Sequence, residues 1–145
     1  MHQLYGDEEV VRFTIQRVLS EADTWRTMAT LAGHWLLRGY GPYALEEKKT
    51  GTVLGYTGMW YPGEWPAPEI AWALARQFWG KGYAKEAALA VKRMALEYFP
   101  GLRLISLIDK NNTHSRKLAE AMGASVEKEI IFKDHLCCLY RHAYD

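Results

Sequence analysis

A strand, a glycine-rich turn and a helix follow one another in the middle of this chain, and that order constrains the fold. Large and small residues alternate over 69–75, which predicts a strand with Ile70, Trp72 and Leu74 on one face. Gly80 and Gly82 lie in the turn that follows. A helix is then predicted from apolar residues at helical spacing, which are Ala84, Ala87, Ala88, Val91, Ala95 and Tyr98.

The turn predicts an anion-binding site. The first N–H groups of a helix have no partners within the helix and carry the positive end of its dipole, so a pyrophosphate would satisfy them. Two common phosphate loops fit poorly. A P-loop needs Ser or Thr after Gly80-Lys81, where Gly82 stands, and Lys85 occupies the place of the third glycine of a dinucleotide fingerprint. The alternative is a plain turn that leads into a helix.

The turn resembles the cofactor loop of the GNAT family of N-acetyltransferases. Gln77, Gly80 and Gly82 occupy the three defining places of that family's Gln/Arg-x-x-Gly-x-Gly/Ala pattern. The whole segment 69–87 is similar to the branch typified by the ribosomal-protein N-terminal acetyltransferases, the RimJ/RimL-like branch. Residues 112–124 resemble the Asn-x-x-Ser helix of the same branch, which ends at a glycine.

This resemblance covers the chain from about Asp7 to Tyr140 and implies an α+β fold. We expect a GNAT-type mixed, mostly antiparallel central sheet flanked by helices, in a single domain over 1–145. Because residues 7–13 already resemble later family sequence, the family's first strand is expected to be missing. An exposed sheet edge recruits partners, so homodimerisation through that edge is expected.

The resemblance implies acetyl-CoA as the cosubstrate. The backbone of the 72–74 strand would pair with the pantetheine arm as an added strand does. Asn112 either caps its helix or contacts the cofactor, and the two roles are compatible. The expected cofactor contacts are Trp72, Ala73, Leu74, Gln77, Gly80, Lys81, Gly82, Tyr83, Ala84, Asn112 and Ser115.

The catalytic groups are expected on three separate segments. Glu69 is the expected general base because it begins the strand that leads into the loop, and Glu64 is the second choice. Either one is otherwise a solvated glutamate. Many relatives carry a tyrosine acid seven residues after the asparagine, but Ala119 stands there. Ser115 and Tyr140 therefore compete for the role of general acid, against the alternatives of a serine bonded to its own helix and a core tyrosine.

The acceptor is expected to be an amine. Trp60 and Trp65, with Glu64 between them, are candidates for an acceptor pocket, although most tryptophans of a chain like this belong to the core. An aromatic wall favours a hydrophobic or cationic acceptor. Two functions remain: transfer of an acetyl group to a protein α-amine or a small-molecule amine, and a non-catalytic acyl-CoA-binding module.

Composition narrows the classes further. The chain has 145 residues, one domain's length, and a formal net charge of +1, which offers no bulk attraction for nucleic acid or an anionic membrane. Adjacent Cys137 and Cys138 do not form a disulfide framework, which suits a reducing cytoplasm. No signal peptide, apolar run of 18 residues or metal-ligand spacing is present, so a cytoplasmic enzyme without a metal is expected.

The remaining elements are predicted from caps, periodicity and turns. Ser20 begins a helix that ends at Arg38-Gly39, with an apolar stripe formed by Trp25, Met28, Ala29, Ala32 and Leu36. Strands are expected over 42–47, 52–60, 102–108, 126–132 and 136–140. The proline-rich segment 61–68 is expected to be a loop.

Overall fold

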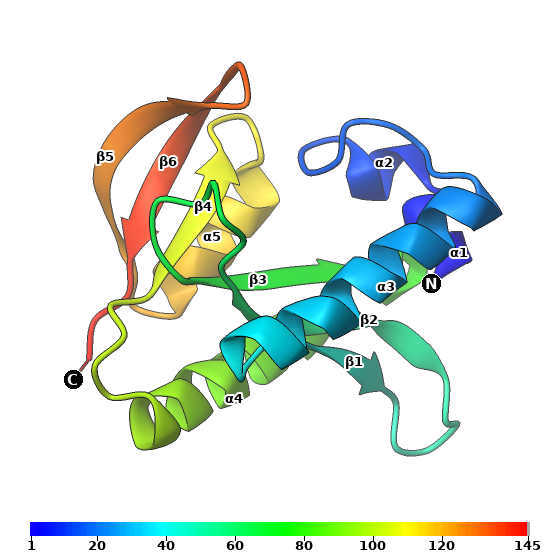
Figure 1. Ribbon diagram of the computed structural model, residues 1–145, viewed down its shortest axis with the longest axis horizontal. Helices are drawn as coiled ribbons and strands as arrows, with labels where there is room; N and C mark the ends of the chain where they lie inside the picture. The colour runs from blue at the N-terminus through cyan, green and yellow to red at the C-terminus, as the bar shows by residue number, and fades with distance from the viewer. Residues whose placement is uncertain (145) are drawn as a thin grey trace.

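Six strands form one sheet with helices on both faces (Figure 1). The computed structural model describes residues 1–144. In chain order the elements are α1 (His2–Tyr5), α2 (Glu8–Val11), α3 (Glu21–Arg38), β1 (Pro42–Glu46), β2 (Val53–Trp60), β3 (Glu69–Leu74), the 3-10 helix η1 (Arg76–Phe78), α4 (Tyr83–Tyr98), β4 (Ile105–Asp109), α5 (Thr113–Ala121), β5 (Ser125–Phe132) and β6 (His135–Arg141).

The sheet has the order β1-β2-β3-β4-β6-β5, and all neighbours are antiparallel except β3 and β4. These two parallel strands pair only at Glu69 and Ile105. Beyond that point they diverge, as the arrows of β3 and β4 in Figure 1 show. The mixed, mostly antiparallel sheet flanked by helices confirms the fold class expected from the sequence.

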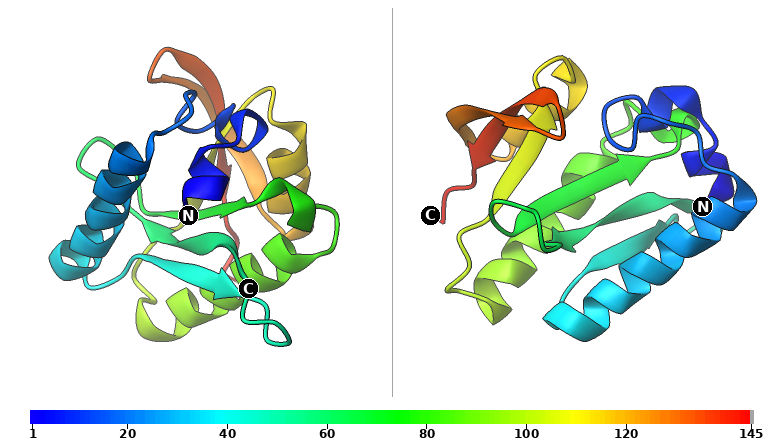
Figure 2. Two further views of the ribbon diagram at one scale, coloured as in Figure 1. Left: turned by 90° about the vertical axis from the view of Figure 1, so that its right-hand side faces the viewer. Right: turned by 45° about the horizontal axis from the view of Figure 1, so that its top comes forward.

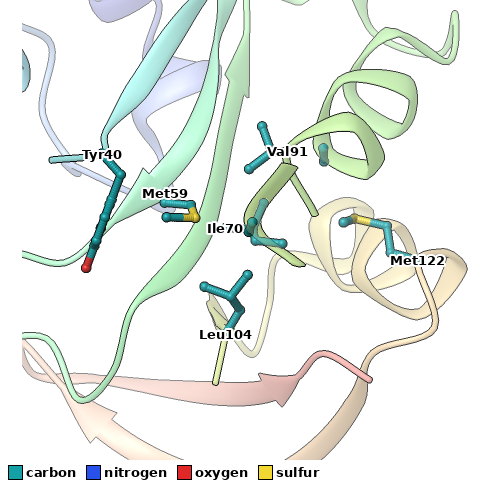
Figure 3. Close-up of a cluster of buried hydrophobic side chains, with 8 residues drawn as sticks. Tyr40, Met59, Ile70, Val91, Leu104 and Met122 are labelled. Atoms are coloured by element: carbon teal, nitrogen blue, oxygen red, sulfur yellow. The ribbon is translucent and has the colours of Figure 1, made fainter. Parts of the chain in front are cut away.

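Helices α3 and α4 lie on opposite faces of the β1–β3 half of the sheet (Figure 2). Successive residues of a strand point to opposite faces, and the end of β2 shows both environments. Met59 is fully buried in a cluster with Ile70 of β3 and Val91 of α4 (Figure 3). Its neighbour Trp60 stacks on His34 of α3, with ring centroids 4.5 Å apart.

Helix α3 begins and ends where the sequence predicts. The Ser20 hydroxyl accepts a hydrogen bond from the Asp23 N–H, and Gly39 adopts the left-handed conformation that ends the helix, at φ 75°. Arg38 closes the last turn, and its Nε donates to the Tyr61 carbonyl. The two ends of this helix are therefore set by local signals.

The predicted apolar stripe of α3 is wrong, because it faces solvent. Trp25 is 71% exposed and Leu36 is 88% exposed, and the other members of the stripe, Met28, Ala29 and Ala32, are exposed as well. The buried face instead carries two polar residues, Thr24 and His34. His34 binds the Tyr40 carbonyl and the Tyr61 N–H, so burying this imidazole satisfies groups that an apolar side chain would leave unpaired.

The first described elements are the two short helices α1 and α2. Their buried side chains, among them Leu4, Tyr5 and Val11, form a small cluster with Leu19 against Tyr56 of β2. The first strand is β1, and within residues 1–144 its outer edge pairs with no other strand. Cys137 and Cys138 are both buried free thiols. No described helix has the length and apolar character that crossing a membrane requires.

Candidate functional site

A groove of about 690 Å³ lies along the end of β3, beyond the point where β3 stops pairing with β4. One wall is the end of β3, from Trp72 to Leu74, and the opposite wall is the start of α5. The glycine turn closes one end, with Gly80, Gly82, Tyr83 and Ala84 among the lining residues. The groove therefore gathers most of the predicted cofactor contacts.

The glycine turn has the backbone that its sequence implies. Gly80 and Gly82 have φ values of 72° and 84°, in the left-handed region that favours glycine. A Cβ at either position would meet no other atom within 4 Å, so the space beside the turn is open. Helix α4 begins at Tyr83, and no described side chain caps its first N–H groups. An anionic group fits this helix start.

Two side-chain hydrogen bonds hold the turn against the rest of the molecule. Trp79 Nε1 donates to the Leu74 carbonyl at 2.8 Å, and the Tyr83 hydroxyl donates to Glu47 Oε1 at 2.7 Å. The Trp79 ring also stacks on His114, with centroids 6.1 Å apart, and so links the turn to α5. The turn is thus fixed in position relative to both walls of the groove.

Asn112 and Ser115 lie where the groove meets a second cavity. The Asn112 side chain caps α5 by accepting the Ser115 N–H at 3.2 Å, and it lines the groove as well. The Ser115 hydroxyl accepts a hydrogen bond from Trp72 Nε1 at 3.3 Å. Capping and lining occur together, as the sequence allowed.

The second cavity has a volume of about 320 Å³ and shares Trp72, Asn112 and Ser115 with the groove. Its other walls carry aromatic rings, two carboxylates and the basic side chains of Lys133 and His135. They include Trp60, Trp65 and Phe132, together with the carboxylates of Glu69 and Asp109. The groove and the second cavity therefore adjoin beside Trp72 and Ser115.

Glu69 lies in this second cavity and is only 7% exposed. Its Oε1 accepts a hydrogen bond from Trp65 Nε1 at 2.8 Å, and its Oε2 accepts one from the Leu107 N–H at 2.9 Å. Burial outweighs these two bonds and raises the pKa of the carboxyl to about 7. A group with this pKa exchanges protons readily near neutral pH.

The 61–68 loop contacts the β5–β6 turn at the wall of the second cavity. The Trp65 and Phe132 rings meet edge to face with centroids 5.0 Å apart, and Lys133 Nζ lies 4.8 Å from the Trp65 ring centre. Glu64 Oε1 pairs with Lys133 Nζ at 2.7 Å. Glu64 is exposed and is not among the residues that line either cavity.

Three other predicted site residues lie away from the cavities. Tyr140 is fully buried, and its hydroxyl accepts from Arg116 Nε at 3.0 Å and donates to Glu120 at 2.8 Å. Gln77 and Lys81 belong to the turn segment but are not among the lining residues. The structure does not bring these three side chains together with Glu69 and Ser115.

Several cavity residues were not predicted. Phe13 and Thr14 line both cavities, and nothing local to their segment indicates this. Asp109 and Cys137 also line the second cavity. Asp109 had a signal, since it is an acidic residue at the end of an apolar strand, three residues before Asn112.

The Cys137 thiol is poorly suited to act as a nucleophile. Burial, with the nearby charges of Asp109 and Glu69, raises its pKa to about 11, so it stays protonated at neutral pH. Among residues 1–144, no group of three or more His, Cys, Asp or Glu side chains is placed to hold a metal ion.

Curated sequences include two relatives from Bacillus. The uncharacterized protein YkkB of Bacillus subtilis is 35% identical over 98 residues, which span 64% of this chain and 56% of that protein. An uncharacterized N-acetyltransferase, p20, of Bacillus licheniformis is 28% identical over 92% of this chain and 75% of its own length. The match to YkkB thus spans little more than half of that protein.

Solved structures share the whole fold. A Bordetella pertussis protein assigned to the GnaT family of acetyltransferases has a TM-score of 0.82 and 27% identity, covering 97% of this chain and 88% of that one. The structure of yncA from Salmonella typhimurium, solved with its cofactor acetyl-CoA, has a TM-score of 0.74 and 19% identity over 99% and 86%. The ribosomal-protein-S5-alanine acetyltransferase of Vibrio fischeri has a TM-score of 0.74 and 15% identity, covering 99% of this chain and 87% of that one.

The sequence itself matches a family model. Residues 1–125 match the model of the acetyltransferase (GNAT) domain, which is most of the chain and includes the glycine turn and the Asn112 helix. The chain therefore belongs to the GNAT acetyltransferase family.

Proposed function

We propose that this protein is an N-acetyltransferase that moves the acetyl group of acetyl-CoA to a primary amine by direct attack in a ternary complex. One observation carries the proposal: the groove and the second cavity meet beside Trp72 and Ser115. The glycine turn lies on the groove side of this junction, and the buried carboxyl of Glu69 lies on the other. Both reactants can therefore reach one point.

The groove fits acetyl-CoA, whose thioester supplies the activated acetyl group. The N–H groups at the start of α4 would bind the pyrophosphate, and the open space beside Gly80 and Gly82 lets it approach. Backbone groups of Trp72 to Leu74 would pair with the pantetheine arm where β4 has turned away. Each charge-assisted bond contributes about 1.5 to 3 kcal/mol.

Glu69 is the proposed general base. A lysine-like amine costs roughly 4.6 kcal/mol to deprotonate at pH 7, and a protein N-terminus only about 1.4 kcal/mol. A carboxyl with a pKa of about 7 accepts a proton far better than a solvated glutamate does, while still ionised in part at neutral pH. Each oxygen of this carboxylate accepts one hydrogen bond, so each keeps a second lone pair that can take that proton.

Ser115 is the proposed general acid for the leaving thiolate. Its hydroxyl lies at the junction of the two cavities and accepts from Trp72 Nε1, so its own proton is free to be donated. Tyr140 is less suitable, because its hydroxyl is held between Arg116 and Glu120 away from both cavities.

A cationic amine is the proposed acceptor. Trp60 and Trp65 offer aromatic faces, and the carboxylates of Glu69 and Asp109 supply negative charge in the same cavity. A small-molecule amine and a protein N-terminus both carry this charge. The RimJ/RimL-like branch, which acts on protein N-termini, is supported by the two sequence motifs at 69–87 and 112–124.

Turnover measured with a panel of primary amines tests the function. We expect at least one amine to increase CoA release over the blank, and we expect Glu69→Gln to lower kcat by about 10²- to 10⁴-fold. The matched control is Glu127→Gln on β5, an exposed carboxyl paired with Arg141, which should change kcat less than twofold. Unchanged turnover in Glu69→Gln would remove Glu69 from the mechanism.

The panel also separates the second function. A wild-type protein that binds acetyl-CoA but releases CoA no faster with any amine would instead be a non-catalytic acyl-CoA-binding module.

A further inference from the structure

The backbone pairing between β3 and β4 stops abruptly. The Ile105 N–H donates to the Pro68 carbonyl at 2.9 Å, as a regular parallel pair requires. The next bond of such a ladder would join the Leu107 N–H to the Ile70 carbonyl. This bond between the Leu107 N–H and the Ile70 carbonyl is not formed.

Two side chains take the places of the missing bond. Glu69 Oε2 accepts the Leu107 N–H at 2.9 Å, and the Ser106 hydroxyl donates to the Ile70 carbonyl at 2.8 Å. Both backbone groups are therefore satisfied without contact between the strands. Without these substitutes, the two buried groups would lack partners, and pairing with each other to extend the ladder would satisfy both.

His142 orients the Ser106 hydroxyl. Its Nε2 lies 2.9 Å from Ser106 Oγ, and the hydroxyl's single proton is already donated to Ile70. Nε2 must therefore carry a proton and donate it to Ser106 Oγ, which assigns the tautomer of this ring. Ser106 and His142 are 1% and 2% exposed, so solvent does not compete for this chain of bonds.

The tautomer leaves the other ring nitrogen unpaired. His142 Nδ1 is buried and has no hydrogen-bond partner among residues 1–144. A buried polar atom without a partner lowers stability, and a phenylalanine at this position would avoid that cost. The imidazole offsets this cost with the hydrogen bond from its Nε2 to Ser106, which a phenylalanine could not form.

The groove begins where this arrangement ends. Trp72, two residues after Ile70 on the same edge of β3, is the first β3 residue that lines it. We propose that Ser106, oriented by His142, is a positioning residue that stops the β3–β4 ladder after Glu69 and Ile105 and keeps the β4-facing edge of β3 at Trp72 unpaired for the cofactor arm. The identity of the ligand, acetyl-CoA, rests on the proposed function. The hydrogen bonds that stop the ladder do not depend on that function.

Calorimetric titration of acetyl-CoA into Ser106→Ala tests the role in binding. Without the hydroxyl, we expect the ladder to extend by one bond and the Kd for acetyl-CoA to rise about tenfold, the equivalent of one hydrogen bond of about 1.4 kcal/mol. His142→Phe should raise the Kd in the same direction. If neither variant changes the Kd by more than twofold, the inference is overturned.

Thr57→Val is the matched control. The Thr57 hydroxyl also donates to a carbonyl of β3, that of Ala71, at 2.8 Å, and it is 2% exposed. It does so on the β2 side, where the ladder is complete. This variant should lose similar stability and keep the Kd within twofold, so an equal loss of affinity in both variants would count against a specific role for Ser106.

A measurement on the ligand-free protein separates this inference from the proposed function. In the wild type, the NMR shift of the Leu107 amide proton should follow the titration of Glu69 near pH 7, because that carboxylate accepts it. In Ser106→Ala the amide moves to the Ile70 carbonyl, and its pH response should fall by at least half. An unchanged response overturns the inference. Loss of the pH response of the Leu107 amide in Ser106→Ala, together with a wild type that binds no acetyl-CoA, would support the strand arrangement and overturn the proposed function.

Discussion

Glu69 shows how far one residue's surroundings can change its chemistry. At the start of a strand, a glutamate is often solvated, and the sequence left that alternative open beside the role of base. The structure removes it, because the side chain is 7% exposed and bonded to Trp65 and Leu107. Its place at the start of β3 was predicted. Its burial was not, since Leu107 lies 38 residues away in the sequence.

Burial of this carboxyl has a consequence for stability. Its pKa is about 7 in the folded protein and 4.5 ordinarily, so the folded state holds the proton more tightly and loses stability as pH rises from about 4.5 to 7. Glu69→Gln does not titrate. Relative to the wild type, its free energy of unfolding should therefore rise by roughly 3 kcal/mol across that range, at about 1.4 kcal/mol per pKa unit.

Urea unfolding of both proteins at pH 4.5, 6 and 7.5 measures this difference. The histidines titrate in both proteins and cancel in the comparison. A difference between the two proteins that stays constant with pH would show that the folded-state pKa of Glu69 is not raised.

At the scale of single elements, local sequence signals predicted where helices begin and end, but they did not predict which face of α3 is buried. The Ser20 cap, the end of α3 at Gly39 and the glycine turn before α4 were all predicted, because each depends on a few neighbouring residues. The buried face of α3 was missed. Its key residue, His34, is polar, and its partners at Tyr40 and Tyr61 come from elsewhere in the fold, so apolar periodicity selected the exposed side.

The cap of α3 can be tested directly. Ser20→Ala removes the acceptor of the Asp23 N–H and should lower the free energy of unfolding by about 1 kcal/mol. Chemical denaturation measures it, with Ser125→Ala, an exposed residue at the start of β5, as the control that should change little. Equal effects in the two variants would contradict the capping role.

At the scale of the whole molecule, the site is assembled from distant segments. The second cavity takes residues from the segment after α2, from β3 and its preceding loop, from β4, and from the β5–β6 hairpin. Sequence spacing predicted the cofactor turn, which is contiguous. It could not predict that Phe13, Asp109 and Cys137 would share a cavity with Glu69, because only the tertiary fold brings them together.

We propose that the protein forms a homodimer through the outer edge of β1, which pairs with no other strand within residues 1–144. Large apolar side chains are exposed on β1 and on the helix that precedes it: Leu36 and Leu37 at the end of α3 are 88% and 84% exposed, and Tyr43 of β1 is 44% exposed. A second copy would cover both the edge and these side chains. Sedimentation at tens of micromolar should give twice the monomer mass, and Leu37→Lys should shift the equilibrium towards monomer. A monomeric wild type at that concentration would contradict the proposal.

Calorimetric titration of acetyl-CoA tests the central claim, that the glycine turn binds this cosubstrate, most directly. The wild type should bind with micromolar Kd, and Gly82→Glu should lose binding because it places a negative charge in the pyrophosphate site. Gly123→Glu is the matched control, since Gly123 has nearly the same left-handed φ of 83°, equally open surroundings and no place in the groove. Binding kept in Gly123→Glu and lost in Gly82→Glu is the predicted result. No binding by folded wild-type protein, or equal binding by both variants, would contradict the account.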